Sequence, residues 1–287
     1  MRVGFVTSLL WDRYGPFWDR LLRAAGATIV TAEPDRLARA AEDPRVAVAS
    51  GRAFRGAVVE ALALSGACDR IVVPDLNAGY DGARGSAQDP FVADLPGTLA
   101  RGVPGLPAIT GVPADLAHAD LERVATRLLA EVAPTSELRR LWQTHRADAR
   151  PPRRTPATGA ARPSADTVAL VGQPWHLTEA VRARLERSGE RLLSANDLDP
   201  HDLRSEGWRA DPGLAPTDAE ALGAIRRFAR RAGVARIRMV VDPESGADAW
   251  LARRAKGTVR RPFETVDLPA EASVDLPADV GESTEAP

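Results

Sequence analysis

Short apolar segments alternate with amphipathic helical segments along most of the chain, and this alternation is the strongest constraint on its fold. Residues 2–7 (RVGFVT) form a continuous apolar run, which is typical of a buried parallel strand. A helical segment follows, in which Pro16 suits the first turn and Gly26 the end. A second strand-like run, ATIVTA, comes next at residues 27–32. This β-α-β opening predicts an α/β fold built on a parallel sheet.

The same alternation recurs after a change in composition. Residues 146–165 hold four prolines and five arginines with almost nothing to bury, which is typical of an exposed linker. A new strand-like run, TVALV, then begins at residue 167, and the 287-residue chain is long enough for two α/β domains. Beyond about residue 270 the sequence is acidic with no apolar period, so we expect disorder there. The predicted parts are an N-terminal α/β domain at 1–146, a Pro/Arg-rich linker at 147–165, a C-terminal α/β domain at 166–268 and a disordered acidic tail at 269–287.

Composition and missing motifs exclude several classes of function. The formal net charge of -1 argues against a general binder of nucleic acid or of membrane surfaces. The N-terminal residues lack a signal-peptide pattern and no apolar run reaches about 18 residues, so we expect a cytoplasmic protein. The sequence also lacks a phosphate-binding P-loop, a dinucleotide fingerprint and a nucleophile elbow.

Histidine and cysteine usage predicts no metal site. None of the four histidines pairs with another at metal-ligand spacing, and we expect surface or capping roles for them (His118, His145, His176 and His201). The single cysteine, Cys68, cannot form an internal disulfide or anchor a cysteine-ligated cluster alone. It stands just before the apolar run RIVVP at residues 70–74, which favours a buried apolar role.

Three stretches of the sequence together resemble one protein family. They are VGF, SLL and YGPFW at residues 3–18, VALVGQPW at residues 168–175, and SGADA at residues 245–249 followed by RPF at 261–263. In order and spacing over residues 1–267 they are similar to the 2-hydroxyacyl-CoA dehydratase and CoA-substrate-specific activase-associated family, which is 2-hydroxyglutaryl-CoA dehydratase-like. This resemblance implies three cysteines that hold an iron–sulfur cluster at a cleft between two domains, where a CoA thioester enters.

The chain departs from the family at the cluster itself. By the family's pattern the three cysteines would fall at Gly51, Asp89 and Ser245. Ligation of the cluster needs thiolates, which glycine, a carboxylate and a hydroxyl do not supply. We therefore predict a degenerate site with no iron–sulfur cluster and no dehydratase chemistry of the family's type, and whether the chain is an enzyme stays open.

The expected architecture is two Rossmann-like or flavodoxin-like doubly wound parallel-sheet domains that face each other across a cleft. Loops at the carboxyl ends of parallel strands form the ligand sites of such sheets. The function expected here is binding of a small anionic ligand, such as an acyl-CoA, in that cleft. The alternative is a non-catalytic scaffold or partner subunit of a larger complex, and a cluster enzyme whose metal comes from a partner chain ranks last. The candidate cleft residues are Trp11, Tyr14, Asp75, Asp89, Gly172, Trp175, Ser245 and Asp248.

Two groups of side chains near these loops have two interpretations each. The tryptophans either stack on a ligand or pack between the domains (Trp11, Trp18, Trp175 and Trp250). The acidic residues either form a hard-cation site or an acid/base pair, or serve as ordinary turn and helix-cap residues (Asp75, Asp81, Asp89, Asp242, Glu244 and Asp248).

Overall fold

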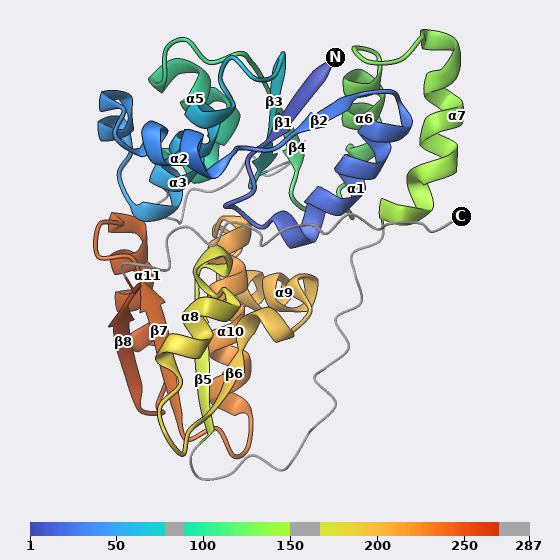
Figure 1. Cartoon of the computed structure of the whole chain (residues 1–287). Coiled ribbons are helices and arrows are strands. Elements are labelled where there is room, and N and C mark those ends of the chain that lie inside the picture. Colours follow the sequence, from blue (N-terminus) through green and yellow to red (C-terminus); the bar gives the residue numbers. More distant parts are fainter. Residues whose placement is uncertain (78–88, 150–166, 270–287) are drawn as a thin grey trace, which may run out of the picture.

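The described residues of the chain form two separate parallel sheets of four strands each (Figure 1). The structure, a computed structural model, describes residues 1–77, 89–149 and 167–269. The sheets have the strand orders β2-β1-β3-β4 and β6-β5-β7-β8, and every neighbouring pair is parallel. The α/β class expected from the sequence is therefore confirmed. The strands are β1 (Arg2–Phe5), β2 (Thr28–Val30), β3 (Arg70–Asp75), β4 (Ala108–Pro113), β5 (Thr167–Gly172), β6 (Arg191–Ser194), β7 (Arg236–Val241) and β8 (Phe263–Asp267).

Helices cover both faces of the N-terminal sheet. Successive residues of a strand point to opposite faces, so Ile71 and Val73 of β3 enter one hydrophobic core while Val72 enters another. The first core contains residues of α2 (Pro34–Ala41), α3 (Arg52–Leu64), α4 (Pro90–Ala93) and α5 (Leu95–Gly102). The second contains residues of α1 (Trp11–Ala24), α6 (Leu121–Leu129) and α7 (Thr135–His145).

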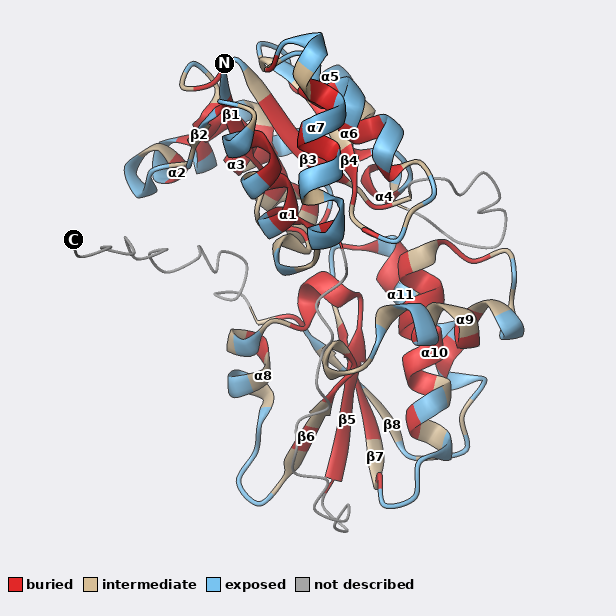
Figure 2. Cartoon of the chain, turned by 90° about the vertical axis from the view of Figure 1, so that its right-hand side faces the viewer, coloured by how far each residue is buried: buried red, intermediate tan, exposed pale blue. Residues whose placement is uncertain are grey.

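The C-terminal sheet is built around β5, in which all six residues are buried. Its core includes residues of α8 (Glu179–Leu185), α9 (Pro200–Ala210), α10 (Pro216–Arg230) and α11 (Gly246–Lys256). Helices α9 and α10 pack closely because two glycines let their backbones touch. A Cβ on Gly207 or on Gly223 would lie 1.9 Å from a backbone oxygen of the facing helix. Figure 2 shows the buried residues of this half concentrated on its central strands and on α10.

The two halves contact each other through polar side chains and one aromatic side chain. Arg13 of α1 donates to both carboxylate oxygens of Glu220 on α10, at 2.9 and 2.7 Å. Arg204 of α9 donates to Asp115 at 2.6 Å. Trp175 packs into the first core of the N-terminal half, where its ring centroid lies 5.9 Å from that of Phe91.

The structure corrects two details of the predicted elements. Apolar residues at helical spacing in the sequence predict a helix over residues 114–133, but the helix is confined to α6 because residues 114–120 form turns. The sequence also favours Thr217 as the N-cap of a helix over residues 217–232, but helix α10 begins at Pro216 with Ala215 as its N-cap, so Thr217 is inside the helix. Most of the predicted linker and tail (150–166 and 270–287) lies outside the described residues, and the domain boundaries stay predictions. Within the described part of the chain, no helix combines the length and apolar character needed to cross a membrane.

Candidate functional site

A small cavity lies where the two halves of the chain meet. The volume that the centre of a water-sized molecule can occupy inside it is about 10 Å3, so the cavity has room for roughly one water molecule. The N-terminal half contributes Gly51, Ala53, Asp89, Phe91 and Val92, and the C-terminal half contributes Gln173, Trp175, His176, Asp218, Asp242, Ser245, Ala247 and Asp248.

Strand ends and helix starts position the polar side chains of this cavity. Gln173 follows β5 and Asp242 follows β7, and these neighbouring strands run in parallel. Their carboxyl ends therefore deliver both side chains to the same edge of the sheet. Ser245 is the N-cap of α11, where its Oγ accepts from the Asp248 backbone N–H at 3.1 Å. From the other half, Asp89 is the N-cap of the four-residue helix α4.

The three positions that the family resemblance assigns to cysteines meet at this cavity. Ser245 Oγ donates to Asp89 Oδ2 at 2.8 Å, across the boundary between the halves. A Cβ on Gly51 would lie 3.9 Å from Ser245 Cβ. These residues do not fit an iron–sulfur cluster, because one has no side chain and the others offer oxygen. Cys68, as predicted, is buried away from the cavity and its Sγ donates to the Leu64 carbonyl at 3.4 Å.

Asp242 completes the first turn of a helix in the opposite half. Its Oδ2 accepts from the Arg52 backbone N–H, the first residue of α3, at 2.5 Å, and its Oδ1 accepts from the Glu244 N–H at 3.0 Å. The first N–H groups of a helix lack partners within the helix and carry partial positive charge, so a carboxylate there is stabilised. Gly51, the N-cap of α3, has φ of 81°, a left-handed conformation that favours glycine.

Asp248 and His176 form a buried pair in the cavity wall. Asp248 Oδ2 lies 3.3 Å from His176 Nδ1 and accepts from the Asp242 backbone N–H at 2.8 Å. Trp175 Nε1 donates to His176 Nε2 at 3.1 Å, so in the neutral imidazole the proton is on Nδ1, facing Asp248. The geometry between His176 Nδ1 and the Asp248 carboxyl group does not meet the criteria for a hydrogen bond, and His176 Nδ1 has no other hydrogen-bond partner.

Burial shifts the ionisation of this pair in opposite directions. Removal from water raises the pKa of Asp248 to about 8, and the nearby carboxylates of Asp242, Asp89 and Asp218 act in the same direction. Removal from water lowers the pKa of His176 to about 4. At neutral pH the pair is therefore a protonated carboxyl group beside a neutral imidazole. Burial also raises the pKa of Asp89.

Gln173 brings an unpartnered oxygen into the cavity wall. Its Nε2 donates to Asp218 Oδ1 at 2.6 Å, while its Oε1 has no hydrogen-bond partner although the residue is 2% exposed. A buried polar atom left without a partner costs about 1–3 kcal/mol. Such an atom is a position where a water molecule or a ligand can donate.

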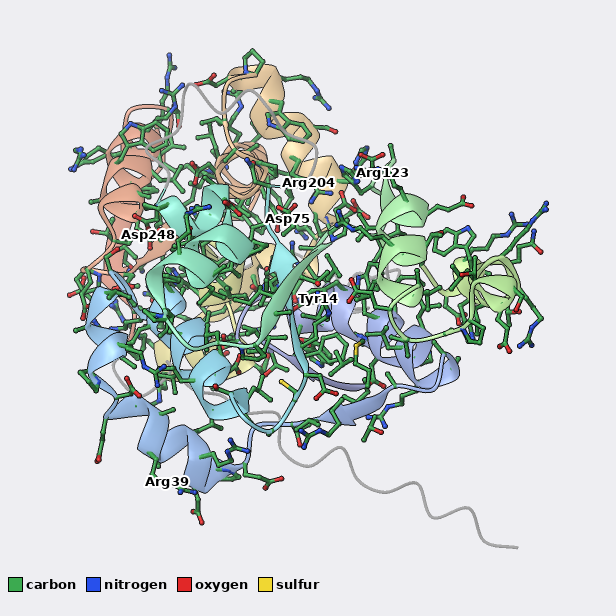
Figure 3. The ribbon with its side chains drawn as sticks, turned by 90° about the horizontal axis from the view of Figure 1, so that it is seen from above. Tyr14, Arg39, Asp75, Arg123, Arg204 and Asp248 are labelled. Atoms are coloured by element: carbon green, nitrogen blue, oxygen red, sulfur yellow. The ribbon has the colours of Figure 1, made fainter. Side chains whose placement is uncertain are left out.

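Four of the predicted cleft residues line the cavity and four do not. Asp89, Trp175, Ser245 and Asp248 line it. Tyr14 is fully buried in the N-terminal half and its hydroxyl donates to the Val6 carbonyl at 2.7 Å. Figure 3 shows Tyr14 and Asp248 in separate parts of the molecule.

The other three lie outside the cavity for identifiable reasons. Trp11 packs edge-on against Phe5 and Tyr14, at centroid distances of 5.0 and 5.7 Å. Asp75 ends β3, where its Oδ1 accepts from the Asn77 N–H at 3.1 Å. Gly172 ends β5, where a Cβ would lie 2.7 Å from the Val240 carbonyl oxygen, so its role is close strand packing.

The remaining tryptophans near the predicted cleft loops, Trp18 and Trp250, and the acidic Glu244 lie outside the cavity. Trp18 is fully buried in the N-terminal core, and Trp250 lies under the Arg254 guanidinium at 5.5 Å from its ring centroid. Packing therefore accounts for both. Glu244 pairs with Arg55 at 2.5 Å on an exposed surface. Asp81 lies outside the described residues.

Sequence reasoning missed three polar residues of the cavity. His176 was expected at the surface or in a capping role, which is wrong, because the residue is 3% exposed and lines the cavity. Gln173 was visible only as part of a strand-to-turn motif. Asp218 lies in the first turn of α10, where an acidic residue is so common that it gives no functional signal.

Comparison of the chain with protein-family models, with curated proteins and with solved structures found no match of any of the three kinds. Within residues 1–77, 89–149 and 167–269, no three His, Cys, Asp or Glu side chains are grouped so that they could hold a metal ion.

Proposed function

We propose that this chain is a relative, without a cluster, of the 2-hydroxyacyl-CoA dehydratase and activase-associated proteins, and that it binds a small molecule in the cavity between its halves. One observation carries the proposal. Gly51, Asp89 and Ser245, which the resemblance alone assigned to a common site, lie together around that cavity. The strand orders of the two sheets also support the finer expectation of two flavodoxin-like halves that face each other across a cleft.

The lining of the cavity modifies the expected ligand. Carboxyl groups of Asp89, Asp218, Asp242 and Asp248 surround it, of which Asp248 is protonated at neutral pH, and among the described residues no lysine or arginine lines it. Carboxylates repel an anionic group, so an acyl-CoA would have to present an uncharged part of its acyl chain here. The lining favours a ligand group that donates hydrogen bonds.

Entry of a ligand requires the halves to separate, because the cavity has room for about one water. The contacts between the halves suit such a motion. They include the ion pairs of Arg13 with Glu220 and of Arg204 with Asp115, and polar interfaces within a chain generally permit relative movement.

The scaffold alternative lacks a comparable observation. Among the described residues, Met1 and Val48 are the large apolar side chains that are exposed. The described surface therefore presents no extended apolar patch of the kind that marks a protein-binding face.

Thermal unfolding against a mixed library tests the proposal. The library holds CoA thioesters, free CoA, nucleotides, organic acids, alcohols and amines. A ligand at 100 times its Kd adds about 2.7 kcal/mol, which raises the Tm of a protein of this size by roughly 5–10 °C.

Two variants locate the binding site. Ala53→Leu places a larger side chain in the cavity wall, and Ala41→Leu makes the same change on the exposed end of α2. We expect at least one chemical class to stabilise the wild type and Ala41→Leu but not Ala53→Leu. The proposal is overturned if no class stabilises the wild type, or if Ala53→Leu responds as the wild type does.

A further inference from the structure

We infer that the cavity recognises the ammonium group of a small primary amine. This inference rests on the proposed function and names the chemical class of its ligand. It follows from the charge of the cavity wall, from a buried amide oxygen and a carboxylate oxygen that lack hydrogen bonds, and from the size and apolar side of the cavity.

The charge of the wall is unbalanced. Its charged carboxylates come from three places, the start of α4, the first turn of α10 and the end of β7, and the first turn of α11 adds the protonated carboxyl group of Asp248. Arg55 is paired with Glu244, and the guanidinium of Arg52, whose charge acts on His176, donates to the Leu268 carbonyl, so one cation stands against three carboxylates. A cation bound among these carboxylates would offset their mutual repulsion.

The unpartnered atoms in the wall point to a ligand that donates hydrogen bonds. Gln173 Oε1 accepts no hydrogen bond although the residue is almost completely buried. Asp89 uses Oδ2 for Ser245, and no hydrogen bond to its Oδ1 is present among the described residues. An ammonium group carries three donors, which match the kinds of acceptor that line this cavity, an amide oxygen and carboxylates.

The cavity size and its apolar side select among cations. Room for about one water accommodates an ammonium group but not a planar guanidinium. The described His, Cys, Asp and Glu side chains form no group suited to a metal ion. Phe91, Val92 and Trp175 also line the cavity, and their side chains would contact the carbon chain of an amine as the halves open.

Three isosteric probes test the inference: benzylammonium, benzyl alcohol and benzoate, with methylammonium as the smallest amine. At pH 7 we expect both amines to raise the Tm of the wild type, and the alcohol and the carboxylate to leave it unchanged. At 100 times its Kd an amine should give a rise of roughly 5–10 °C.

A matched pair of substitutions separates the site from general charge effects. Asp89 and Asp120 are both helix N-caps whose side chains bond no backbone N–H of their helix. Asp89→Asn keeps an acceptor for Ser245 but removes the charge, and should weaken amine binding at least about tenfold. Asp120→Asn, where the carboxylate pairs with Arg123 outside the cavity, should bind the amine like the wild type.

Proton release gives a second readout that a surface effect would not produce. Asp248 is protonated at pH 7, so a cation bound beside it should expel a proton. Calorimetry in two buffers with different ionisation enthalpies measures this proton, and Asp248→Asn should abolish it.

The outcomes separate this inference from the proposed function. If thioesters, alcohols or acids stabilise the wild type but not Ala53→Leu, while amines do not, the site exists and the ammonium assignment is wrong. If amines bind equally to Asp89→Asn and Asp120→Asn, the assignment is also wrong. If nothing in the library binds, both proposals fail.

Discussion

Replacing Asp248 with asparagine should change how the stability of the protein depends on pH. Asp248 is 2% exposed, and its pKa in the folded protein is about 8 against an ordinary value of 3.8. Between these two values the folded state holds a proton that the unfolded state has released. The stability that this group contributes is therefore present at low pH and is lost as the pH rises.

The size of the effect follows from the shift. Over the interval between the two pKa values, each pH unit removes about 1.4 kcal/mol from the free energy of unfolding. The wild type should thus lose roughly 3 kcal/mol relative to Asp248→Asn between pH 5 and pH 7. Asparagine has no proton to exchange, so contributions of all unaffected groups cancel in this difference.

His176 gives the wild type a distinctive curve. Its pKa is lowered from 6.5 to about 4, so between these values the unfolded state binds the extra proton and stability rises with pH. In the wild type the contributions of His176 and Asp248 to the free energy of unfolding change in opposite directions up to pH 6.5. Between pH 6.5 and pH 8 only the contribution of Asp248 changes, and it falls by about 2 kcal/mol. In Asp248→Asn the contribution of His176 to the stability should rise up to pH 6.5 and then stay level.

Urea unfolding followed by tryptophan fluorescence at half-unit pH steps measures both curves. Asp120→Asn, at an exposed N-cap, serves as the control and should follow the wild type between pH 5 and pH 8. Parallel curves for the wild type and Asp248→Asn would refute the reasoning, because they would mean that Asp248 titrates alike in the folded and unfolded states.

Three further substitutions test the packing around the site by urea unfolding. Arg13→Met leaves the buried Glu220 carboxylate unpaired and should lower the free energy of unfolding by about 3–5 kcal/mol. The double variant that also carries Glu220→Met should lose clearly less stability, and equal losses would contradict this reasoning. Glu60→Gln should cost about 1–3 kcal/mol, because the carboxylate accepts four hydrogen bonds and an amide oxygen cannot replace both of its oxygens; an unchanged stability would contradict this. Gly207→Ala should destabilise the protein by about 1–3 kcal/mol, although alanine has the better helix propensity. Gly246→Ala, where a Cβ meets nothing within 4 Å, should change the stability by no more than about 0.5 kcal/mol. Similar effects at both glycines would contradict the close packing of α9 against α10.

Periodic segments of the sequence predicted the fold class because strand and helix patterns are local. Buried runs such as residues 70–74 and the helix at residues 135–145 were recognisable without tertiary information. The helix expected from residue 114 failed because side chains there bond to the backbone instead. Asp115 accepts from the Ala117 N–H and His118 Nδ1 accepts from the Asp120 N–H, and such bonds favour turns over helix.

The candidate site was only partly predictable, since its contacts join residues far apart in the sequence. The resemblance located Asp89 and Ser245, whose contact crosses the two halves. No local spacing signals that Gln173 faces Asp218. The loop after β1 was expected at the site, but its Thr7 and Ser8 hydrogen-bond to the Glu60 carboxylate within the N-terminal half.

Gly51, one of the positions that the family resemblance assigns to a cysteine, lies where the two halves contact each other. A Cβ at this position would lie 3.2 Å from Asp242 Oδ2, and the φ of 81° is strained for any residue with a side chain. A cysteine here would therefore crowd the carboxylate that accepts from the Arg52 N–H at 2.5 Å. The glycine therefore favours the contact between Asp242 and the start of α3, because a side chain at position 51 would require Asp242 to move by a few tenths of an ångström. Under the proposed ancestry, loss of this ligand relieves the crowding of the contact between Asp242 and α3, and the position of the family's cluster is an acidic cavity in this chain.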